Sequence, residues 1–168
     1  GIAVASANDA CVAVAEHMSG SVESFVELMN KRAKELGMKD TNFINCNGLD
    51  ADGHYTTAYD MALLTREALN NRIFADICKL ETATLEYGNP PYRRTLSNSN
   101  KMLKMYDGAI GVKTGFTDNA RRTLVSAATR NGVTLICVTL SDPDDWKDHT
   151  ALLDYGFSKV SMQTVTDN

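Results

Sequence analysis

Three extended segments in the second half of the chain constrain its fold most. Residues 109–116, 122–129 and 133–140 are each predicted as a β-strand, and the last is apolar enough for a central strand. Asn131-Gly132 separates the second segment from the third, and this dipeptide is typical of a two-residue hairpin turn. An antiparallel sheet is therefore expected in this half of the chain.

The first half predicts helices. One helix is expected over residues 8–17, with Gly20 as its stop. Ser21 is expected to cap a second helix that ends before Gly37. The apolar residues of that second helix recur at helical spacing and predict one buried stripe, made of Val22, Phe25, Val26, Met29, Ala33 and Leu36.

Turn-forming residues then fill residues 38–56. The densest part is NGLDADG, and its acidic residues are not spaced as in an EF-hand, so turn chemistry is the better interpretation. Thr57, with Asp60 three residues on, resembles a capping box and predicts a helix through Leu69. A strand is predicted over residues 80–87, where Asn89-Pro90-Pro91 breaks it.

The last predicted element is a helix. Asp142 is expected as its N-cap and Pro143 as its first residue. Trp146, Thr150, Leu153 and Phe157 lie along one face of it. Helices, then antiparallel strands, then a helix packed on them make an α+β fold. We expect a domain over residues 1–157, and a linker or tail over residues 158–168.

Composition excludes several kinds of function. The net charge is -4 and the basic residues form only short, separated clusters, so nucleic acid is not an expected partner. No pair of cysteines has C-x-x-C spacing and no histidine pair has H-E-x-x-H spacing, so neither a metal nor another cofactor is expected. Cys11, Cys46, Cys78 and Cys137 are predicted to be free thiols, with Cys11 and Cys137 buried.

Two short motifs carry residues suited to catalysis. Ser6-Ala7-Asn8 lies at the start of the first predicted helix, and Lys113-Thr114-Gly115 lies late in a predicted strand. Taken singly each has an ordinary explanation, because Ser6 suits a helix cap and Lys113 suits a solvent-facing position. Together and in this order they match two of the three signatures of penicillin-binding proteins and class A β-lactamases.

Longer stretches make the resemblance more specific. SANDACVAVAEHMSG, GMKDTNF, NGLDADG, DGAIGVKTGFT and LLDYGF all resemble the low-molecular-mass D-alanyl-D-alanine carboxypeptidases of peptidase S11 type. This resemblance implies a helical subdomain and an antiparallel sheet with packed helices, as part of a β-lactamase/transpeptidase-like fold. It also implies a serine-type carboxypeptidase, which removes the terminal D-Ala of peptidoglycan pentapeptides through an acyl-serine intermediate.

The resemblance assigns a role to each motif residue. Ser6 and Lys113 are the catalytic residues, joined in a proton-transfer network in which Lys113 orients Ser6 and attracts the substrate carboxylate. The substrate-binding residues hold an extended peptide along the strand edge. Asn8 bonds the substrate amide, Thr114 bonds the carboxylate, Gly115 permits close approach, and the N–H of Phe116 is half of an oxyanion hole.

The chain also departs from the family pattern. Arg121 stands where the family often has glycine. Some members place an arginine ahead of the last helix, but that stretch is here Asp145-Trp146-Lys147-Asp148, with Lys147 a possible helper. No serine is followed three residues later by lysine. The expectation is therefore a fragment without its N-terminal Ser-x-x-Lys segment, inactive by itself and able to associate through an exposed sheet edge.

The implied partners are the peptidoglycan stem peptide and β-lactam antibiotics. The implied location is extracytoplasmic, either at the outer face of the bacterial cytoplasmic membrane or secreted. Two alternatives stay open. One is a non-catalytic module that binds cell-wall peptide or penicillin. The other is a class A β-lactamase fragment, which is disfavoured because no loop with a deacylating glutamate is evident.

Overall fold

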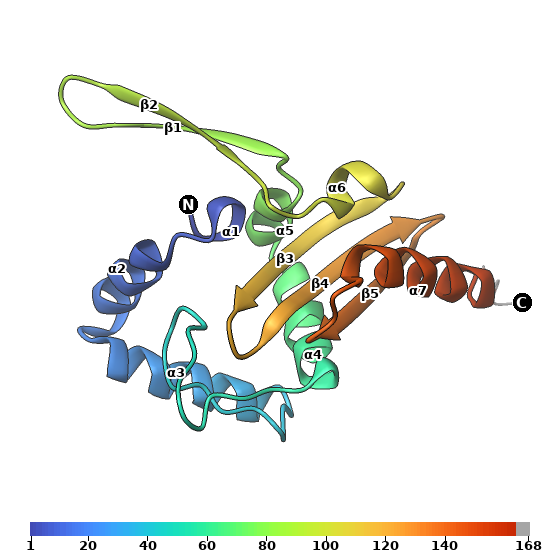
Figure 1. Ribbon diagram of the computed structural model, residues 1–168, viewed down its shortest axis with the longest axis horizontal. Coiled ribbons are helices and arrows are strands. Elements are labelled where there is room, and N and C mark those ends of the chain that lie inside the picture. The colour runs from blue at the N-terminus through green and yellow to red at the C-terminus, as the bar shows by residue number, and fades with distance from the viewer. Residues whose placement is uncertain (164–168) are drawn as a thin grey trace, which may run out of the picture.

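The computed structural model describes residues 1–163 and contains an antiparallel three-stranded sheet with the order β3-β4-β5. The strands are β3 (Ala109–Thr117), β4 (Arg121–Arg130) and β5 (Val133–Leu140). Helix α7 (Asp145–Lys159) covers one face, and α4 (Ala58–Leu69) with α5 (Arg72–Cys78) covers the other (Figure 1). The predicted α+β class is confirmed.

The remaining elements surround this sheet. The N-terminal helices lie to one side of it and are α1 (Ile2–Ala5), α2 (Asn8–Ser19) and α3 (Val22–Glu35). A separate two-stranded hairpin and a short helix precede β3, namely β1 (Thr82–Tyr87), β2 (Tyr92–Ser97) and α6 (Met102–Met105). No helix within residues 1–163 combines the length and apolar character needed to span a bilayer.

All three predicted strands of the main sheet are confirmed. Asn131 and Gly132 both have positive φ angles, 50° and 80°, as the predicted hairpin turn requires. The prediction that residues 133–140 form a central strand is wrong for the described sheet, because β4 lies in the middle and β5 at an edge. The apolar residues of β5 are explained by helices on both faces rather than by strands on both sides.

Two apolar clusters hold the sheet between its helices. On the α7 side the buried residues are Met102, Tyr106, Leu124, Ala128, Cys137 and Leu153. On the α4 and α5 side they are Cys78, Val112, Val125 and Ala127. Trp146 and Phe157 pack against the first cluster, which confirms the predicted inner face of the last helix. Removing these surfaces from water stabilises the position of β3 from both sides.

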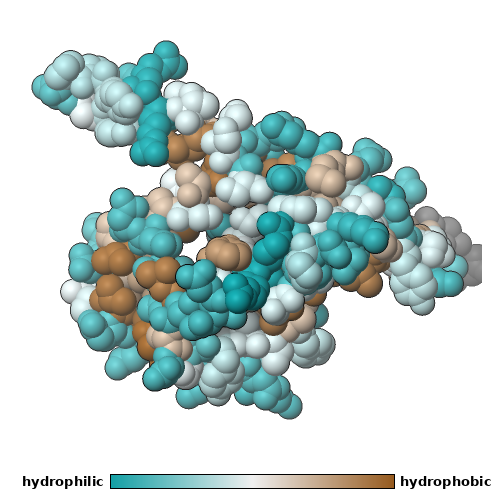
Figure 2. All heavy atoms as spheres, in the orientation of Figure 1, coloured by the Kyte–Doolittle hydropathy of each residue, from teal (hydrophilic) through white to brown (hydrophobic). Residues whose placement is uncertain are grey.

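The predicted helix boundaries are mostly confirmed by their caps. The Ser21 hydroxyl accepts a hydrogen bond from the Ser24 backbone N–H at 3.1 Å, and Gly20 and Gly37 both have a φ of 79°. Only Val26 and Ala33 of the predicted α3 stripe are buried. Figure 2 shows apolar surface gathered over the region of α2 and α3, in keeping with this shallow burial.

The capping box at α4 is only half formed. Thr57 accepts a hydrogen bond from the Asp60 backbone N–H at 3.1 Å, as predicted. The Asp60 carboxylate does not return to Thr57. It accepts instead from the backbone of Asp40 at 2.9 Å and from the Thr41 hydroxyl at 2.7 Å. Asp60 is buried, and its bonds join α4 to the preceding loop.

Three local predictions need correction. Helix α7 begins at Asp145 rather than Pro143, and Asp142 accepts a hydrogen bond from the Asp144 N–H in the turn before it. The segment after Asn89-Pro90-Pro91 returns as β2 and makes a hairpin with β1, which the sequence analysis does not predict. Helix α7 continues two residues past 157, so part of the predicted tail is helical, and residues 164–168 lie outside the described part.

The four cysteines are free thiols, as predicted. Cys78 and Cys137 are buried. Cys11 was also expected to be buried, but it is only partly covered because it lies on α2, beside the site described next.

Candidate active site

The two sequence motifs meet between the N-terminal helices and the sheet. Ser6 was predicted at the start of a helix, but it is the C-terminal cap of α1, with a left-handed φ of 52°. Asn8 begins α2. The Ser6-Ala7-Asn8 motif therefore forms the bend between two helices. Both Ser6 and Asn8 are exposed there, and among residues 1–163 the Asn8 amide has no hydrogen-bond partner.

Lys113 reaches this bend from β3. Its ammonium group donates a hydrogen bond to the Ser6 hydroxyl and a second, of 2.7 Å, to the Thr114 carbonyl. The side chain is partly buried, and this desolvation lowers the pKa of Lys113 below its usual value. A lysine with a lowered pKa gives up its proton more easily, so the Ser6–Lys113 pair is suited to proton transfer.

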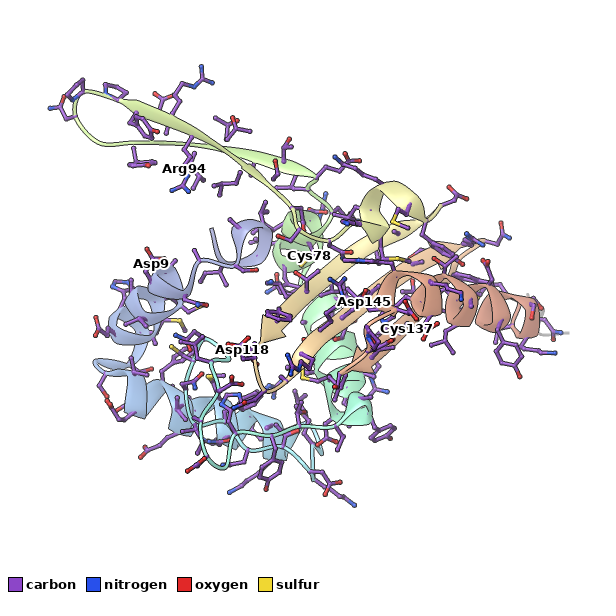
Figure 3. The ribbon with its side chains drawn as sticks, viewed as in Figure 1. Asp9, Cys78, Arg94, Asp118, Cys137 and Asp145 are labelled. Atoms are coloured by element: carbon purple, nitrogen blue, oxygen red, sulfur yellow. The ribbon has the colours of Figure 1, made fainter. Side chains whose placement is uncertain are left out.

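Two thiols flank the lysine. Cys78 lies at the end of α5, next to β3 (Figure 3), and Cys11 lies on α2. Burial raises the pKa of both thiols, so that they surround Lys113 with uncharged groups. A Cβ added at Gly111 would lie 2.9 Å from the Cys78 Cβ, so a side chain there would displace α5 from the strand.

The motif strand β3 is an edge of the described sheet. Its one strand partner is β4, and its other edge faces the N-terminal helices. Gly115 lies opposite Thr123 in the register, and a Cβ on Gly115 would lie 2.4 Å from the Thr123 hydroxyl. Glycine is therefore required by the neighbouring strand as well as suited to close approach of a ligand. Phe116, which follows, is 64% exposed.

The turn after β3 is tied to the 38–56 loop by an acidic residue for which the sequence predicts turn chemistry alone. The Asp50 carboxylate accepts from the Thr117 hydroxyl at 2.7 Å and from the Asn119 N–H at 3.4 Å. Figure 3 shows Asp118 at this turn, on the side facing the loop. Arg121, at the position where glycine was expected, adopts the left-handed φ of 58° that glycine would favour.

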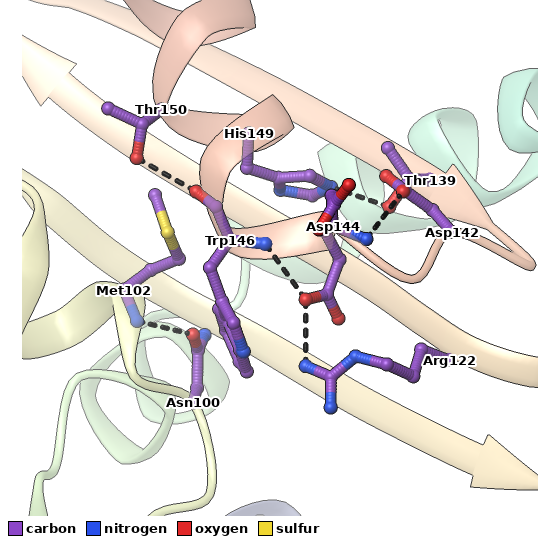
Figure 4. A network of polar contacts seen from close by, with 10 residues as sticks. Asn100, Met102, Arg122, Thr139, Asp142, Asp144, Trp146, His149 and Thr150 are labelled. Atoms are coloured by element: carbon purple, nitrogen blue, oxygen red, sulfur yellow. Dashed lines mark hydrogen bonds and ion pairs between the residues drawn. The ribbon is translucent and has the colours of Figure 1, made fainter.

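A basic residue on β4 approaches the start of α7. Arg122 pairs with the buried Asp145 at 2.7 Å and lies over the Trp146 ring, 5.4 Å from its centroid (Figure 4). Arg122 also lies opposite Phe116 in the β3–β4 register, so the two side chains share a face of the sheet. Lys147, the helper suggested by the sequence, is exposed on α7, and among residues 1–163 it has no ion-pair partner.

The site lies along the edge strand β3. Two surface hollows lie elsewhere, one lined by Leu36, Asp40 and Tyr59 and one by Arg130, Val133 and Phe157. Within residues 1–163 no three histidine, cysteine or acidic side chains are grouped so that they could hold a metal ion. The chemistry that these residues can perform is proton transfer and hydrogen bonding to an extended ligand.

A serine bonded to a strand lysine beside an open β-edge defines a class. It is the arrangement that S-x-N and K-T-G motifs bring to the penicillin-recognising acyl-transfer proteins. The peptidase S11 family, described as D-alanyl-D-alanine carboxypeptidase, matches residues 1–144. The chain belongs to this family.

Relatives and solved structures agree with this assignment. The chain is 43% identical to the D-alanyl-D-alanine carboxypeptidase DacF of Bacillus subtilis over 98% of its own length and 43% of the relative's. It is 37% identical to DacC of Escherichia coli, over 99% of this chain and 41% of that protein. The chain thus spans less than half the length of these two relatives.

The fold also matches solved structures of related proteins. The crystal structure of the Streptomyces K15 DD-transpeptidase superimposes with a TM-score of 0.89 at 32% identity, covering 94% of this chain and 65% of that one. The D-alanyl-D-alanine carboxypeptidase of Mycobacterium tuberculosis superimposes with a TM-score of 0.86 at 33% identity, covering 98% and 66%. The predicted transpeptidase-like fold is confirmed.

Proposed function

We propose that this chain supplies the second and third motifs of a serine-type D-alanyl-D-alanine carboxypeptidase. The observation that carries the proposal is the hydrogen bond from Lys113 on β3 to Ser6 between α1 and α2. Family membership supports the activity, and the open edge of β3 supports an extended peptide as the substrate. Residues 1–157 would be part of the catalytic domain.

The reaction would proceed through an acyl-serine. A serine from a Ser-x-x-Lys segment, which these residues do not contain, would attack the carbonyl carbon of the penultimate D-Ala. The serine proton would pass to the departing nitrogen as the peptide C–N bond breaks, so that D-Ala leaves with a neutral amino group. Ser6 and Lys113 would carry that proton, and the lowered pKa of Lys113 suits the task. Water would then hydrolyse the ester.

The remaining motif residues would hold the substrate. The peptide would extend along the free edge of β3, where Gly115 leaves the backbone accessible. Thr114 would bond the terminal carboxylate and Asn8, whose amide is exposed, would bond a substrate amide. The N–H of Phe116 would be one oxyanion donor, worth roughly 3 kcal/mol when preorganised.

Family membership also suggests where the protein acts and on what. Members act on the cell wall, so an extracytoplasmic location is proposed, at the outer face of the cytoplasmic membrane or beyond it. The proposed ligands are the peptidoglycan stem peptide and β-lactams, which mimic its acyl-D-Ala end. Association through an exposed sheet edge is a further proposal, supported by the edge position of β5.

One observation favours a second candidate function. Because the chain holds no Ser-x-x-Lys, it could bind cell-wall peptide or penicillin without cleaving it. Release of D-alanine separates the two. A protein in which this chain is joined to a family Ser-x-x-Lys segment should release D-Ala from a peptide ending in D-Ala-D-Ala, but not from one ending in L-Ala-L-Ala. Binding of the first peptide without release would favour the binding module and contradict the enzyme.

A further inference from the structure

We propose that Asp50 is a positioning residue of this site, which holds the end of β3 and hence the Phe116 N–H in place. The proposal rests on the proposed function and adds a residue outside both motifs. It starts from the two contacts of the Asp50 carboxylate, one to the Thr117 hydroxyl and one to the Asn119 N–H. Thr117 is the last residue of β3 and directly follows Phe116.

The contacts of Asp50 leave its own loop. Turn chemistry within the loop is performed by Asn45, which accepts from the Gly48 N–H at 2.7 Å and donates to the Leu49 carbonyl at 2.8 Å. Among residues 1–163 the Asp50 carboxylate makes no hydrogen bond inside residues 38–56. An acidic residue that serves only its own turn would bond the backbone a few residues away. Asp50 instead bridges to a strand far along the chain.

The loop gives Asp50 a fixed base. Asn42 and Tyr55 pair through two backbone hydrogen bonds, of 2.9 and 3.1 Å, which close the loop at its stem. The Asn30 amide on α3 donates to the Phe43 carbonyl at 2.8 Å and accepts from the Phe43 N–H at 2.7 Å. A continuous series of contacts thus runs from α3 through the loop to Asp50 and on to β3.

The turn at the end of β3, which Asp50 contacts, needs such support. Asp118, Asn119 and Ala120 are exposed, and β3 has no second strand on its motif edge within the described residues. The Thr117 hydroxyl, while donating to Asp50, accepts from the Ala120 N–H at 3.0 Å and so closes the turn. Arg121 then takes a left-handed conformation that a non-glycine residue adopts at a cost. A carboxylate acceptor is stronger than a neutral one, and it holds this turn in one arrangement.

Position matters for an oxyanion donor. A donor stabilises the transition state only if it is already aimed at the developing charge, and small displacements reduce the rate steeply. Loss of Asp50 would free the Thr117 end of β3 and displace the Phe116 N–H. Lys113 would stay in place, because it lies four residues before Thr117 and directly follows Val112, which packs in the same buried cluster as Cys78 of α5. The expected defect is therefore in the acylation step and not in ligand binding.

The test combines exchange and acylation. Asp50→Ala should speed amide hydrogen exchange of residues 116–120 at least about tenfold in the chain itself. In a protein that joins the chain to a Ser-x-x-Lys segment, it should slow penicillin acylation by a similar factor, with the binding constant of the pre-acylation complex unchanged. Asp52→Ala is the matched control, because Asp52 is exposed in the same loop and makes no described contact.

Two further variants keep the test decisive. Asp50→Asn retains an acceptor oxygen for Thr117 and should recover most of the acylation rate. Asp50→Ala combined with Thr117→Val should slow acylation by less than the product of the two single effects, because the two variants share the loss of one bond while each also removes a bond of its own. Wild-type acylation in Asp50→Ala, whatever its exchange, overturns the proposal. If the joined protein without any substitution is not acylated, the proposed function is wrong, and equal exchange in the Asp50 and Asp52 variants then also overturns the role of Asp50.

Discussion

Lys113 donates a hydrogen bond to Ser6 across 107 residues of sequence. The contact joins the end of α1 to β3 and brings the two short motifs into one site. Burial beside Cys11 and Cys78 lowers the pKa of Lys113 and fits it for proton exchange with the serine.

Gly115→Ala should destabilise the chain by about 1–3 kcal/mol, because the new Cβ would lie 2.4 Å from the Thr123 hydroxyl. Adding Thr123→Ala removes that hydroxyl and should recover much of the loss. Urea unfolding of the two single variants and the double variant measures the coupling. Additive losses would show that the cross-strand contact is not the reason for glycine at this position.

Acid should weaken the fold through His149. This side chain is fully buried between the hydroxyls of Ser126 and Thr139, at 2.5 and 3.1 Å, and burial lowers its pKa to about 4. In the unfolded chain His149 would have the ordinary histidine pKa of about 6.5, so above that pH it is neutral in both states and the folded state keeps its full stability. As pH falls from about 6.5 to 4, up to about 3 kcal/mol should be lost.

Unfolding free energies across that pH range test the assignment. His149→Gln should flatten the slope, whereas His17→Gln, on the exposed part of α2, should leave it as in the wild type. If the unfolding free energy of His149→Gln depended on pH as in the wild type, a group other than His149 would cause the acid sensitivity.

Breaking the ion pair between Arg122 and Asp145 should cost more folding stability than breaking the one between Arg93 and Glu86 on the β1–β2 hairpin. Arg122→Ala would leave the Asp145 carboxylate buried, with 3% of its side chain exposed, and should cost about 2 kcal/mol. Arg93→Ala breaks a pair with Glu86 in which 74% and 58% of the side chains are exposed, and should cost about 0.5 kcal/mol or less. Comparable losses in chemical denaturation would contradict the burial argument.

A thiol count on denatured protein without reductant should return all four cysteines. In the native protein Cys78 and Cys137 should react slowest because both are buried, and the partly exposed Cys11 should react sooner. A count of two or fewer in the denatured protein would reveal a disulfide.

Local signals in the sequence predicted most elements of the fold. Strands β3 to β5, the Asn131-Gly132 turn and the Ser21 cap all depend on neighbouring residues, and all are confirmed. What the sequence did not reveal depends on distant partners. Asp60 bonds Asp40 and Thr41 instead of completing its capping box, and the order of strands in the sheet left β5 at an edge.

The candidate site likewise has residues that the sequence predicts and residues whose roles depend on distant contacts. Two motifs that resemble those of a family predict Ser6 and Lys113 as site residues, and the structure brings their side chains into contact. Asp50 is part of the NGLDADG stretch, but only the folded structure reveals that its carboxylate reaches Thr117. Arg122 likewise gave no sign that it pairs with the acid at the start of α7. Tertiary contacts of this kind leave no periodic pattern in the sequence.

Intact-mass analysis after incubation with a β-lactam tests the central claim most directly. The chain by itself should form no adduct, because Ser6 has no second lysine to activate it as a nucleophile. Joined to a Ser-x-x-Lys segment it should gain one adduct per molecule, and Lys113→Ala or Asn8→Ala should slow that reaction at least about tenfold, ~1.4 kcal/mol of barrier. A stoichiometric adduct on the isolated chain, or wild-type acylation in Lys113→Ala, would contradict the account.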